Sequence, residues 1–503
     1  MANACLVAVL ANAPSPHGEE LTALPETIKW LEIRADLIGD LDADWLRNRF
    51  RGRLLYALRS RSCGGNGPGP GRERRERLLW ARKRYDFVEL EGEYDLHAEV
   101  LEQIPPPLRV ISWYGSVANS QELTSHFRGL VGVDGQLYKL VVTASHVRDG
   151  LTPLQFLKGL RRADTVAYAC GPTGSWSRLL AAHLGAPIIF GSVGDGPVPP
   201  GEFTIAQLTT DYGLPALPPV EALYGILGHT VWSSLSPRFH NAAYRALGHP
   251  ALYVPFGATC FADFWQDVVL KDTLNSLGTP LRGLTVGAPH KEAALALATA
   301  NSPMARRAEA ANVVYWTPGA WEADTTDHAG VLQPLRERGI PLTSGPVAVI
   351  GCGGAGRAIA AALVDAGATV TVVNRGFERG RRAAHRFAVP FIPLSEFSAE
   401  KFAVVVNATP LGRNPGEVPF AVERAAPGAV VVDLVYGPDT TELVCCARAS
   451  GRIAIDGREV LLVQARAQFQ LMTGRYVSMG LARQALGLTS RGATDEAADR
   501  KPT

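Results

Sequence analysis

Short apolar segments alternate with amphipathic segments through the N-terminal part of the chain. The most regular apolar runs are CLVAVLA at 5–11, LLYALRS at 54–60, LRVISWYG at 108–115 and LYKLVVTA at 137–144. With the shorter runs, eight candidate strands and intervening helices fall within about 210 residues, which matches the repeat of a closed parallel (β/α)8 barrel. An open doubly wound sheet is the competing arrangement.

A proline-rich segment separates this region from a second αβ pattern. It reads DYGLPALPPVEA at 211–222, and we expect a linker because proline blocks helix propagation and ladder pairing. From residue 346 a third pattern runs through a strand, a glycine turn, a helix and a second strand. The fold is therefore predicted to be α/β, with a barrel, an αβ domain and a Rossmann domain in that order.

The glycine turn of the third pattern predicts a dinucleotide site. It follows the strand VAVIG directly and contains Gly351, Gly353, Gly354, Ala355 and Gly356. Missing side chains let backbone N–H groups at the start of the next helix approach a pyrophosphate. The alternative is a turn that binds nothing.

The end of the following strand favours NADP over NAD as the coenzyme. It ends in Asn374 and Arg375 instead of an acidic residue that would accept hydrogen bonds from a ribose 2′-hydroxyl. Arg375 and Arg379 are suited to clamp a 2′-phosphate. The alternative is a pair of surface arginines with no ligand.

Composition narrows the class of protein. With 47% apolar and 19% charged residues and a net charge of +2, the chain does not resemble a disordered protein, a coiled coil or a polybasic nucleic-acid binder. The seven cysteines lack metal-ligand spacing, which disfavours a zinc site and a disulfide framework and fits a reducing cytoplasm. We expect neither secretion nor a membrane span, because no long uncharged apolar stretch occurs.

Lysine is scarce, which draws attention to the lysines in apolar surroundings. Only eight of the 50 basic residues are lysine. Arginine cannot deprotonate to act as a nucleophile or a base, so Lys139, inside an apolar strand, and Lys291, in the cluster Pro289-His290-Lys291, are the candidates for chemistry.

Several polar motifs follow one another in the second half. SLSP at 234–237 with His240-Asn241, the Lys291 cluster, Asp327 and the glycine turn are followed by NATPLG at 407–412, VVDLVYGPDTTEL at 431–443 and LLVQARAQFQLMTG at 461–474. In this order they resemble the shikimate dehydrogenase family over residues 222–485.

That resemblance implies a set of site residues. Ser234 and Ser236 would bind the substrate carboxylate, Lys291 and Asp327 would form the catalytic pair, and Asn312 and Gln464 would hold ring hydroxyls. Reduction of a ring ketone by hydride needs a proton donor beside the developing alkoxide, which a lysine next to a carboxylate provides. Taken singly, the serines and Asp327 are also consistent with helix caps, and Lys291 with a solvated lysine.

The sequence also departs from the family pattern. Gly287 stands where the family has a threonine, which removes a hydroxyl expected to reach the substrate, and Thr285, Ser233 and Thr325 replace an asparagine, a histidine and an asparagine. A quinate dehydrogenase is therefore kept as an alternative, against which the intact Ser236 argues.

The first half resembles the type I dehydroquinate dehydratases over residues 4–210. The matching marks are Glu32-Ile33-Arg34, Arg59, ISWYG at 111–115, Lys139, Ser177-Arg178 and Pro200-Gly201. The resemblance implies that Lys139 forms a Schiff base with the substrate, that Arg178 binds its carboxylate, and that Glu32, Arg34 and Arg59 line the mouth. Burial in an apolar strand predicts a lowered pKa for Lys139; a lysine that reaches solvent from a strand end is the alternative.

Here the departures affect the chemistry. Tyr114 stands where the family has its histidine acid-base group, Cys63 replaces a glutamate, and Val198 and Glu202 replace a serine and a glutamine. We expect weak or altered dehydratase activity, because an imidazole of this kind contributes a factor of roughly 10²–10⁴ in rate.

Together these expectations describe a cytoplasmic shikimate-pathway enzyme. The expected substrates are 3-dehydroquinate, 3-dehydroshikimate and shikimate, with NADP as cofactor and no metal, nucleic acid or membrane. A metabolite-sensing regulator that has lost catalysis is the alternative from another class. The predicted domains are the dehydratase-like barrel at 1–213, a substrate-binding domain at 222–330, the Rossmann domain at 331–460, C-terminal helices returning to the substrate domain at 461–488 and a disordered tail at 489–503.

Overall fold

The computed structural model describes residues 2–160, 162–194, 198–343, 345–414, 416–437 and 439–488, so the predicted tail at 489–503 lies outside the described residues. The chain divides into two compact units. The first contains the chain up to Leu223 with Tyr244–Thr259 and Asp263–Leu281, and the second contains Tyr224–Ala243, Cys260–Ala262 and the chain from Arg282 onward. The domain limits named above stay predictions.

The first unit is built around eight parallel strands. They are β2 (Cys5–Leu10), β3 (Trp30–Arg34), β4 (Arg53–Ala57), β5 (Phe87–Glu91), β6 (Arg109–Gly115), β7 (Leu137–Thr143), β8 (Thr165–Cys170) and β9 (Ile188–Ser192). Neighbouring strands follow the chain order, and β2 pairs with both β3 and β9. Because a doubly wound sheet would reverse its strand order, this sequential order confirms the predicted barrel.

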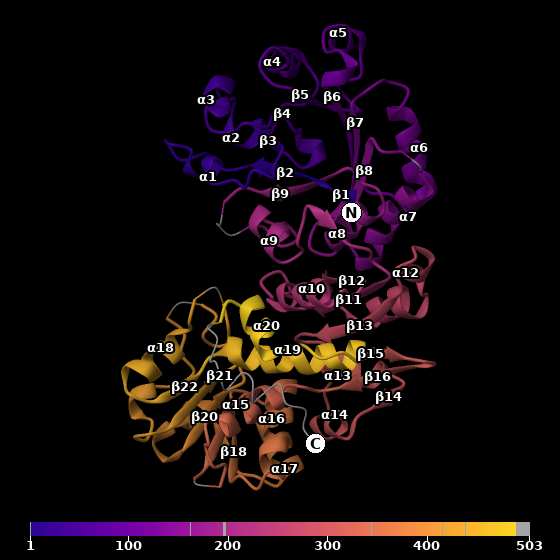
Figure 1. The fold of residues 1–503 in the computed structure, drawn as a ribbon. Helices are drawn as coiled ribbons and strands as arrows, with labels where there is room; N and C mark the ends of the chain where they lie inside the picture. Colours follow the sequence, from indigo (N-terminus) through magenta and orange to yellow (C-terminus); the bar gives the residue numbers. More distant parts are fainter. Residues whose placement is uncertain are drawn as a thin grey trace. The chain divides into compact units, whose positions relative to one another are not determined.

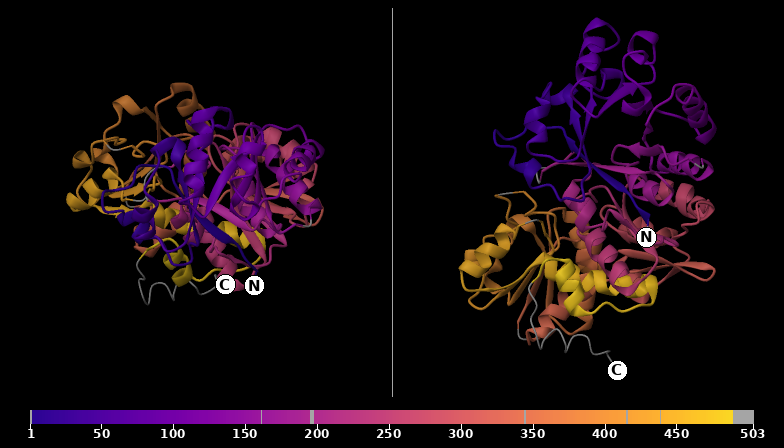
Figure 2. Two further views of the ribbon diagram at one scale, coloured as in Figure 1. Left: turned by 90° about the horizontal axis from the view of Figure 1, so that it is seen from above. Right: turned by 45° about the horizontal axis from the view of Figure 1, so that its top comes forward.

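Helices cover the outside of these strands (Figure 1), and two further views are given in Figure 2. They are α1 (Glu19–Thr22), α2 (Ala35–Ile38), α3 (Ala43–Arg47), α4 (Arg72–Arg82), α5 (Ala98–Leu101), α6 (Ser120–Leu130), α7 (Leu151–Gly159), α8 (Trp176–His183) and α9 (Ile205–Thr210). In α6, Leu123, Phe127 and Leu130 recur at helical spacing and are buried, and the Asn119 side chain caps its first turn. The first unit also contains a pair of short strands, β1 (Ala2–Asn3) and β10 (Ala216–Leu217), with β12 (Ala251–Gly257) and α12 (Thr273–Ser276).

The second unit contains a mixed sheet and a parallel sheet. The mixed sheet includes β11 (Ala222–Gly228), β13 (Leu281–Val286), β15 (Val313–Thr317), β16 (Ala320–Asp324) and β14 (Ala300–Asn301), neighbours in that order. This unit also contains the helices α13 (Lys291–Leu297), α14 (Pro303–Ala308), α15 (Ala329–Glu337), α19 (Gly457–Thr473) and α20 (Met479–Ala485), and the first residues of α10 (Ser236–Leu247) and α11 (Phe261–Phe264) belong to it as well. Between β15 and β16 runs a tight antiparallel hairpin.

The parallel sheet has the Rossmann strand order. Its strands are β19 (Phe391–Pro393), β18 (Val370–Asn374), β17 (Val347–Ile350), β20 (Val404–Asn407), β21 (Val430–Asp433) and β22 (Ile453–Ile455), neighbours in that order. They are connected by α16 (Gly354–Asp365), α17 (Phe377–Phe387) and α18 (Glu442–Ala449) among other segments. The strand order reverses beside β17, which is where such sheets bind ligands at the carboxyl ends of their strands.

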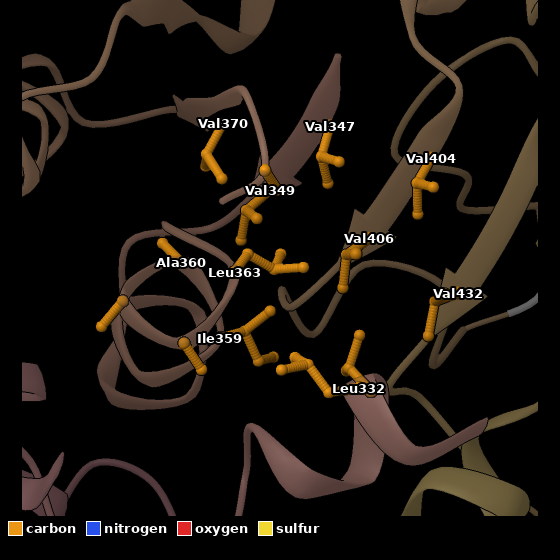
Figure 3. Packing of buried hydrophobic residues seen from close by; sticks show 14 of the residues in the cluster. Leu332, Val347, Val349, Ile359, Ala360, Leu363, Val370, Val404, Val406 and Val432 are labelled. Atoms are coloured by element: carbon orange, nitrogen blue, oxygen red, sulfur yellow. The ribbon is translucent and has the colours of Figure 1, made fainter. Parts of the chain in front are cut away.

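Both faces of this sheet are buried, which explains its continuous apolar strands. Val347 and Val349 of β17 pack with Ile359 and Leu363 of α16, as Figure 3 shows. The alternate β17 residues belong to a second cluster, which includes side chains of α18 on the other face. A strand covered on both sides needs apolar residues at every position. No helix within the described ranges is long and apolar enough to cross a bilayer.

Candidate active sites

Lys291 and Asp327 form a close ion pair in the second unit. Lys291 is the first residue of α13, and Asp327 lies in the segment between β16 and α15. The Lys291 Nζ donates to Asp327 Oδ2 at 2.6 Å, and the two side chains are 18% and 4% exposed. Limited solvent access strengthens the attraction between the charges and holds the lysine in place.

The second oxygen of Asp327 is held by two amides from distant parts of the chain. Asn312 Nδ2 donates to Asp327 Oδ1 at 3.0 Å, and Gln464 Nε2 of α19 donates to the same oxygen at 3.1 Å. Four of the predicted site residues therefore lie in one hydrogen-bonded cluster. With three donors around it, the carboxylate has a fixed orientation toward the lysine.

A second layer of polar side chains supports this cluster and was missed by the sequence reasoning. Gln468 accepts from the Thr285 hydroxyl at 2.9 Å and donates to the Thr326 hydroxyl at 3.2 Å. The Thr326 backbone N–H in turn donates to Asn312 Oδ1 at 2.8 Å. The available signal was the spacing of Gln468, one helical turn after Gln464 on a helix that is otherwise apolar on its inner face.

Ser234 and Ser236 lie together before and at the start of α10. The Ser236 backbone N–H donates to Ser234 Oγ at 3.2 Å, and Ser236 is buried. Ser234 also hydrogen-bonds with Tyr436, a residue that the sequence reasoning passed over although it lies inside the motif VVDLVYGPDTTEL. Burial raises the pKa of Tyr436 more than its polar neighbours lower it, so its hydroxyl remains protonated at neutral pH.

The glycine turn is too tightly packed for side chains at Gly351 and Gly356. Gly351 has φ of 104°, and a Cβ on Gly356 would lie 1.7 Å from the Gly351 carbonyl oxygen. Helix α16 begins at Gly354, with Ala355 in its first turn, and Gly353 at its N-cap has no side chain to bond the first N–H groups. These N–H groups and the helix dipole favour an anion here.

The turn also lies directly against Lys291. A Cβ added to Gly354 would be 3.1 Å from the side chain of Lys291. Arg357 of α16, another residue that sequence reasoning did not select, donates to the Cys352 carbonyl at 3.2 Å and to Glu292 at 2.8 Å. It thus connects the turn to the helix that begins with Lys291.

The candidate coenzyme residues at the end of β18 and after it differ in their contacts. Asn374 Oδ1 accepts from the Cys352 backbone N–H at 3.0 Å, so this side chain braces the turn. Arg375 and Arg379 are exposed. Burial raises the pKa of Cys352 to about 11, although the charges of Arg357 and Arg379 oppose this shift.

In the barrel, Lys139 lies between two carboxylates. Its Nζ is 3.2 Å from Glu32 Oε2 and 3.4 Å from Glu89 Oε2, and all three side chains are almost fully buried. Burial lowers the pKa of Lys139, but the two glutamates outweigh it and the pKa is raised. The prediction of a lowered pKa was wrong because Glu32 and Glu89, which are 107 and 50 residues away along the chain, both lie beside the amine.

Tyr114 is a hydrogen-bond donor within the same network. Its hydroxyl donates to Glu89 Oε1 at 2.5 Å, and its ring lies 4.5 Å from the Arg59 guanidinium. Burial raises the pKa of Tyr114 well above its usual value, although Arg59 acts in the opposite direction. A tyrosine in this state cannot serve as a general base at neutral pH.

The three predicted arginines of the barrel each have a carboxylate partner. Arg34 binds Asp36 through two hydrogen bonds of 2.8 Å. Arg59 lies 3.7 Å from Glu32. Arg178 of α8 is 3.0 Å from Glu202, which stands in the segment before α9. Within the described residues, no group of three or more His, Cys, Asp or Glu side chains is arranged to hold a metal ion.

Comparison with family models matches three consecutive parts of the chain. Residues 5–216 match type I 3-dehydroquinase, residues 226–314 match the shikimate dehydrogenase substrate binding domain, and residues 346–437 match a model described as NADP oxidoreductase coenzyme F420-dependent. These matches follow the order of the barrel, the mixed sheet and the parallel sheet.

Individual proteins also match parts of the chain. The shikimate dehydrogenase (NADP(+)) of Acidiphilium cryptum is 42% identical over 48% of this chain and 87% of its own length. The chloroplastic bifunctional 3-dehydroquinate dehydratase/shikimate dehydrogenase of Arabidopsis thaliana is 28% identical over 89% of this chain and 79% of its own. The Thermus thermophilus shikimate 5-dehydrogenase, solved with NADP(H) and shikimate, is 35% identical over 53% of this chain and 98% of its own, with a TM-score of 0.47.

Proposed function

This chain belongs to the shikimate dehydrogenase family and has a type I 3-dehydroquinase domain ahead of the dehydrogenase part, and on that premise we propose that its second half interconverts 3-dehydroshikimate and shikimate with NADP. The observation that carries the proposal is the 2.6 Å pair of Lys291 and Asp327, packed against the glycine turn. A proton-handling pair beside a coenzyme turn is what a ketone reductase needs.

The residues around the glycine turn fit a dinucleotide phosphate. Gly356 tolerates no side chain, the first turn of α16 presents backbone N–H groups, and Arg375 and Arg379 follow the next strand. The turn would hold the pyrophosphate, and the two arginines would hold the 2′-phosphate. When bound, NADP supplies or accepts the hydride at its nicotinamide ring.

The polar cluster provides the proton chemistry. In the reductive direction, Lys291 donates a proton from Nζ to the oxygen that becomes the ring hydroxyl, and in the oxidative direction it removes that proton. Asp327 keeps the ammonium group in position and stabilises its charge, while Asn312 and Gln464 fix the carboxylate. Ser234 and Ser236, with Tyr436 beside them, are the proposed partners of the substrate carboxylate.

The decisive experiment follows NADP reduction by shikimate, through the absorbance of the reduced nicotinamide, with wild-type protein and Lys291→Ala. Wild type is expected to turn over and the variant to lose most of its kcat. If wild-type protein does not reduce NADP with shikimate, the proposed function of the second half is wrong.

Quinate oxidation is the second candidate, and one observation favours it. A Cβ on Gly287 would meet its nearest neighbour, the Leu227 carbonyl oxygen, only at 3.4 Å. Position 287 therefore has room for a side chain that glycine does not supply. A substrate ring with an additional substituent, such as that of quinate, would fit better there than the ring of shikimate. Rates with shikimate and quinate on one preparation decide between the two substrates.

For the barrel we propose retention of the fold with weak or altered dehydratase activity. Lys139 is available as the Schiff-base amine only if it gives up a proton that Glu32 and Glu89 stabilise, and Tyr114 offers no base. The full-length protein without NADP is expected to form dehydroshikimate slowly from 3-dehydroquinate. A turnover near about 10 s⁻¹, ordinary for an enzyme, would contradict this proposal.

We further propose a cytoplasmic setting and small-molecule partners only. The support for the reducing compartment is that all seven cysteines are free in the structure. For the absence of nucleic acid as a partner, the support is the near-neutral net charge of +2.

A further inference from the structure

Arg178 is a rigidly held cation at one end of the barrel. Its side chain is 5% exposed, its guanidinium lies 4.6 Å from the centre of the Tyr168 ring, and its Nη1 donates to the Phe190 carbonyl at 3.4 Å. The same nitrogen is 3.0 Å from a carboxylate oxygen of Glu202. An arginine fixed in this way is preorganised to bind a carboxylate, and here the chain itself supplies one.

The pKa of Glu202 is affected by the charges of more than one arginine. Burial raises the pKa of Glu202, but the charges of Arg178, Arg59 and Arg34 together outweigh burial and hold the pKa below its usual value. The Glu202 carboxylate therefore stays ionised at neutral pH in a field made by three guanidinium groups. Of these three cations, Arg178 is the one within salt-bridge distance of Glu202, at 3.0 Å.

The charges of this network are already balanced without a ligand. Every cation in it has a carboxylate of the chain within salt-bridge distance; the pairs are Lys139 with Glu32 and Glu89, Arg59 with Glu32, Arg34 with Asp36, and Arg178 with Glu202. Of these carboxylates, Glu202 is the most exposed, with a side chain 39% accessible, whereas Glu32, Glu89 and Asp36 are at most 4% accessible. Glu202 thus occupies the position that an anion from solvent would approach.

We propose that Glu202 is the residue that sets how tightly the barrel binds its ligands: it acts as an internal carboxylate on Arg178 and weakens the binding of small cyclic carboxylates at the site. The inference deepens the proposed function of the barrel and rests on it. A carboxylate from solvent must either displace Glu202 from Arg178 or lie beside it. Like charges at such a distance are strongly unfavourable, so neutralising Glu202 is expected to raise carboxylate affinity by about 100-fold or more.

The test is calorimetric titration of 3-dehydroshikimate into the full-length protein without NADP. Glu202→Gln removes the charge and keeps the shape of the side chain, and Glu102→Gln, at an exposed position on the same unit, is the matched control. Wild type and Glu102→Gln are expected to show a single binding event per chain, in the dehydrogenase half. Glu202→Gln is expected to show a second event, and Glu202→Gln combined with Arg178→Gln is expected to lose it again.

The outcomes separate the inference from the proposed function. A second binding event in wild type, or none in Glu202→Gln, overturns the role of Glu202, and so does a second event that survives the removal of Arg178. Failure of wild type to bind 3-dehydroshikimate at all contradicts the proposed dehydrogenase instead. In that case a binding event gained by Glu202→Gln and lost with Arg178→Gln would still support the inference.

Discussion

Substitution of Asp327 by asparagine tests the proposed proton chemistry most directly. The change keeps the size of the side chain and removes its charge, so the packing around it is preserved. Asp327 accepts hydrogen bonds from Lys291 at 2.6 Å, from Asn312 at 3.0 Å and from Gln464 at 3.1 Å. An asparagine can accept through only one of its two terminal atoms, so its amide group must face at least one of these donors.

The size of the effect follows from these contacts. The charge-assisted bond from Lys291 contributes about 1.5–3 kcal/mol, and a buried donor left facing another donor costs about 1–3 kcal/mol. The pair is poorly accessible to solvent, so water cannot fully replace the lost partner. We expect kcat for shikimate oxidation to fall by about 10²–10⁴-fold, which corresponds to about 3–5 kcal/mol in the activation free energy.

The assay is steady-state NADP reduction with shikimate, with KM and kcat determined separately. The matched control is Asp365→Asn on α16, which removes the same charge at a side chain 47% exposed and paired with Arg307, and its kcat is expected to stay within about twofold of wild type. A kcat for Asp327→Asn within about tenfold of wild type would show that Asp327 has no part in proton transfer.

Four further outcomes are expected. Tyr114→His should raise dehydroshikimate formation by at least about tenfold, because an imidazole titrates near neutrality; unchanged turnover would refute the explanation of the weak barrel. Gly287→Thr should raise the ratio of kcat/KM for shikimate to that for quinate, and a ratio that stays constant would remove Gly287 as a specificity residue. Replacing Arg375 and Arg379 by alanine should raise KM for NADP by about 10–100-fold and leave KM for NAD almost unchanged, as coenzyme kinetics can check. Burial lowers the pKa of His240 to about 3, so below its unfolded value of about 6.5 only the unfolded chain takes up the proton. This histidine should therefore contribute about 2 kcal/mol to the loss of stability from pH 7 to pH 5 in urea unfolding, and His240→Gln should reduce that loss by the same amount.

The sequence by itself predicted the elements of the second half and the candidate site residues that the structure brings together there. Continuous valine-rich strands around a glycine turn specify a parallel sheet with a coenzyme edge, because only strands buried on both faces are apolar throughout. Lys291 and Asp327 were selected as a pair because the motifs around them resemble those of the shikimate dehydrogenases. The strands and helices themselves follow from backbone periodicity, which can be recognised without knowing the fold.

Only the tertiary structure decided which charges meet. Lys139 lies 107 residues from Glu32 and 50 residues from Glu89, and their contact depends on which strands are neighbours and on their register. That contact reversed the predicted direction of the pKa shift of Lys139, because Coulomb attraction at about 3 Å exceeds the cost of burial. In the same way, the sequence showed that Glu202 departs from the family pattern. Its ion pair with Arg178 could be recognised only from the folded barrel, which brings the two side chains together. Electrostatic interactions depend on the distances between charged groups in the folded chain. The periodicity of a sequence carries no information about these distances.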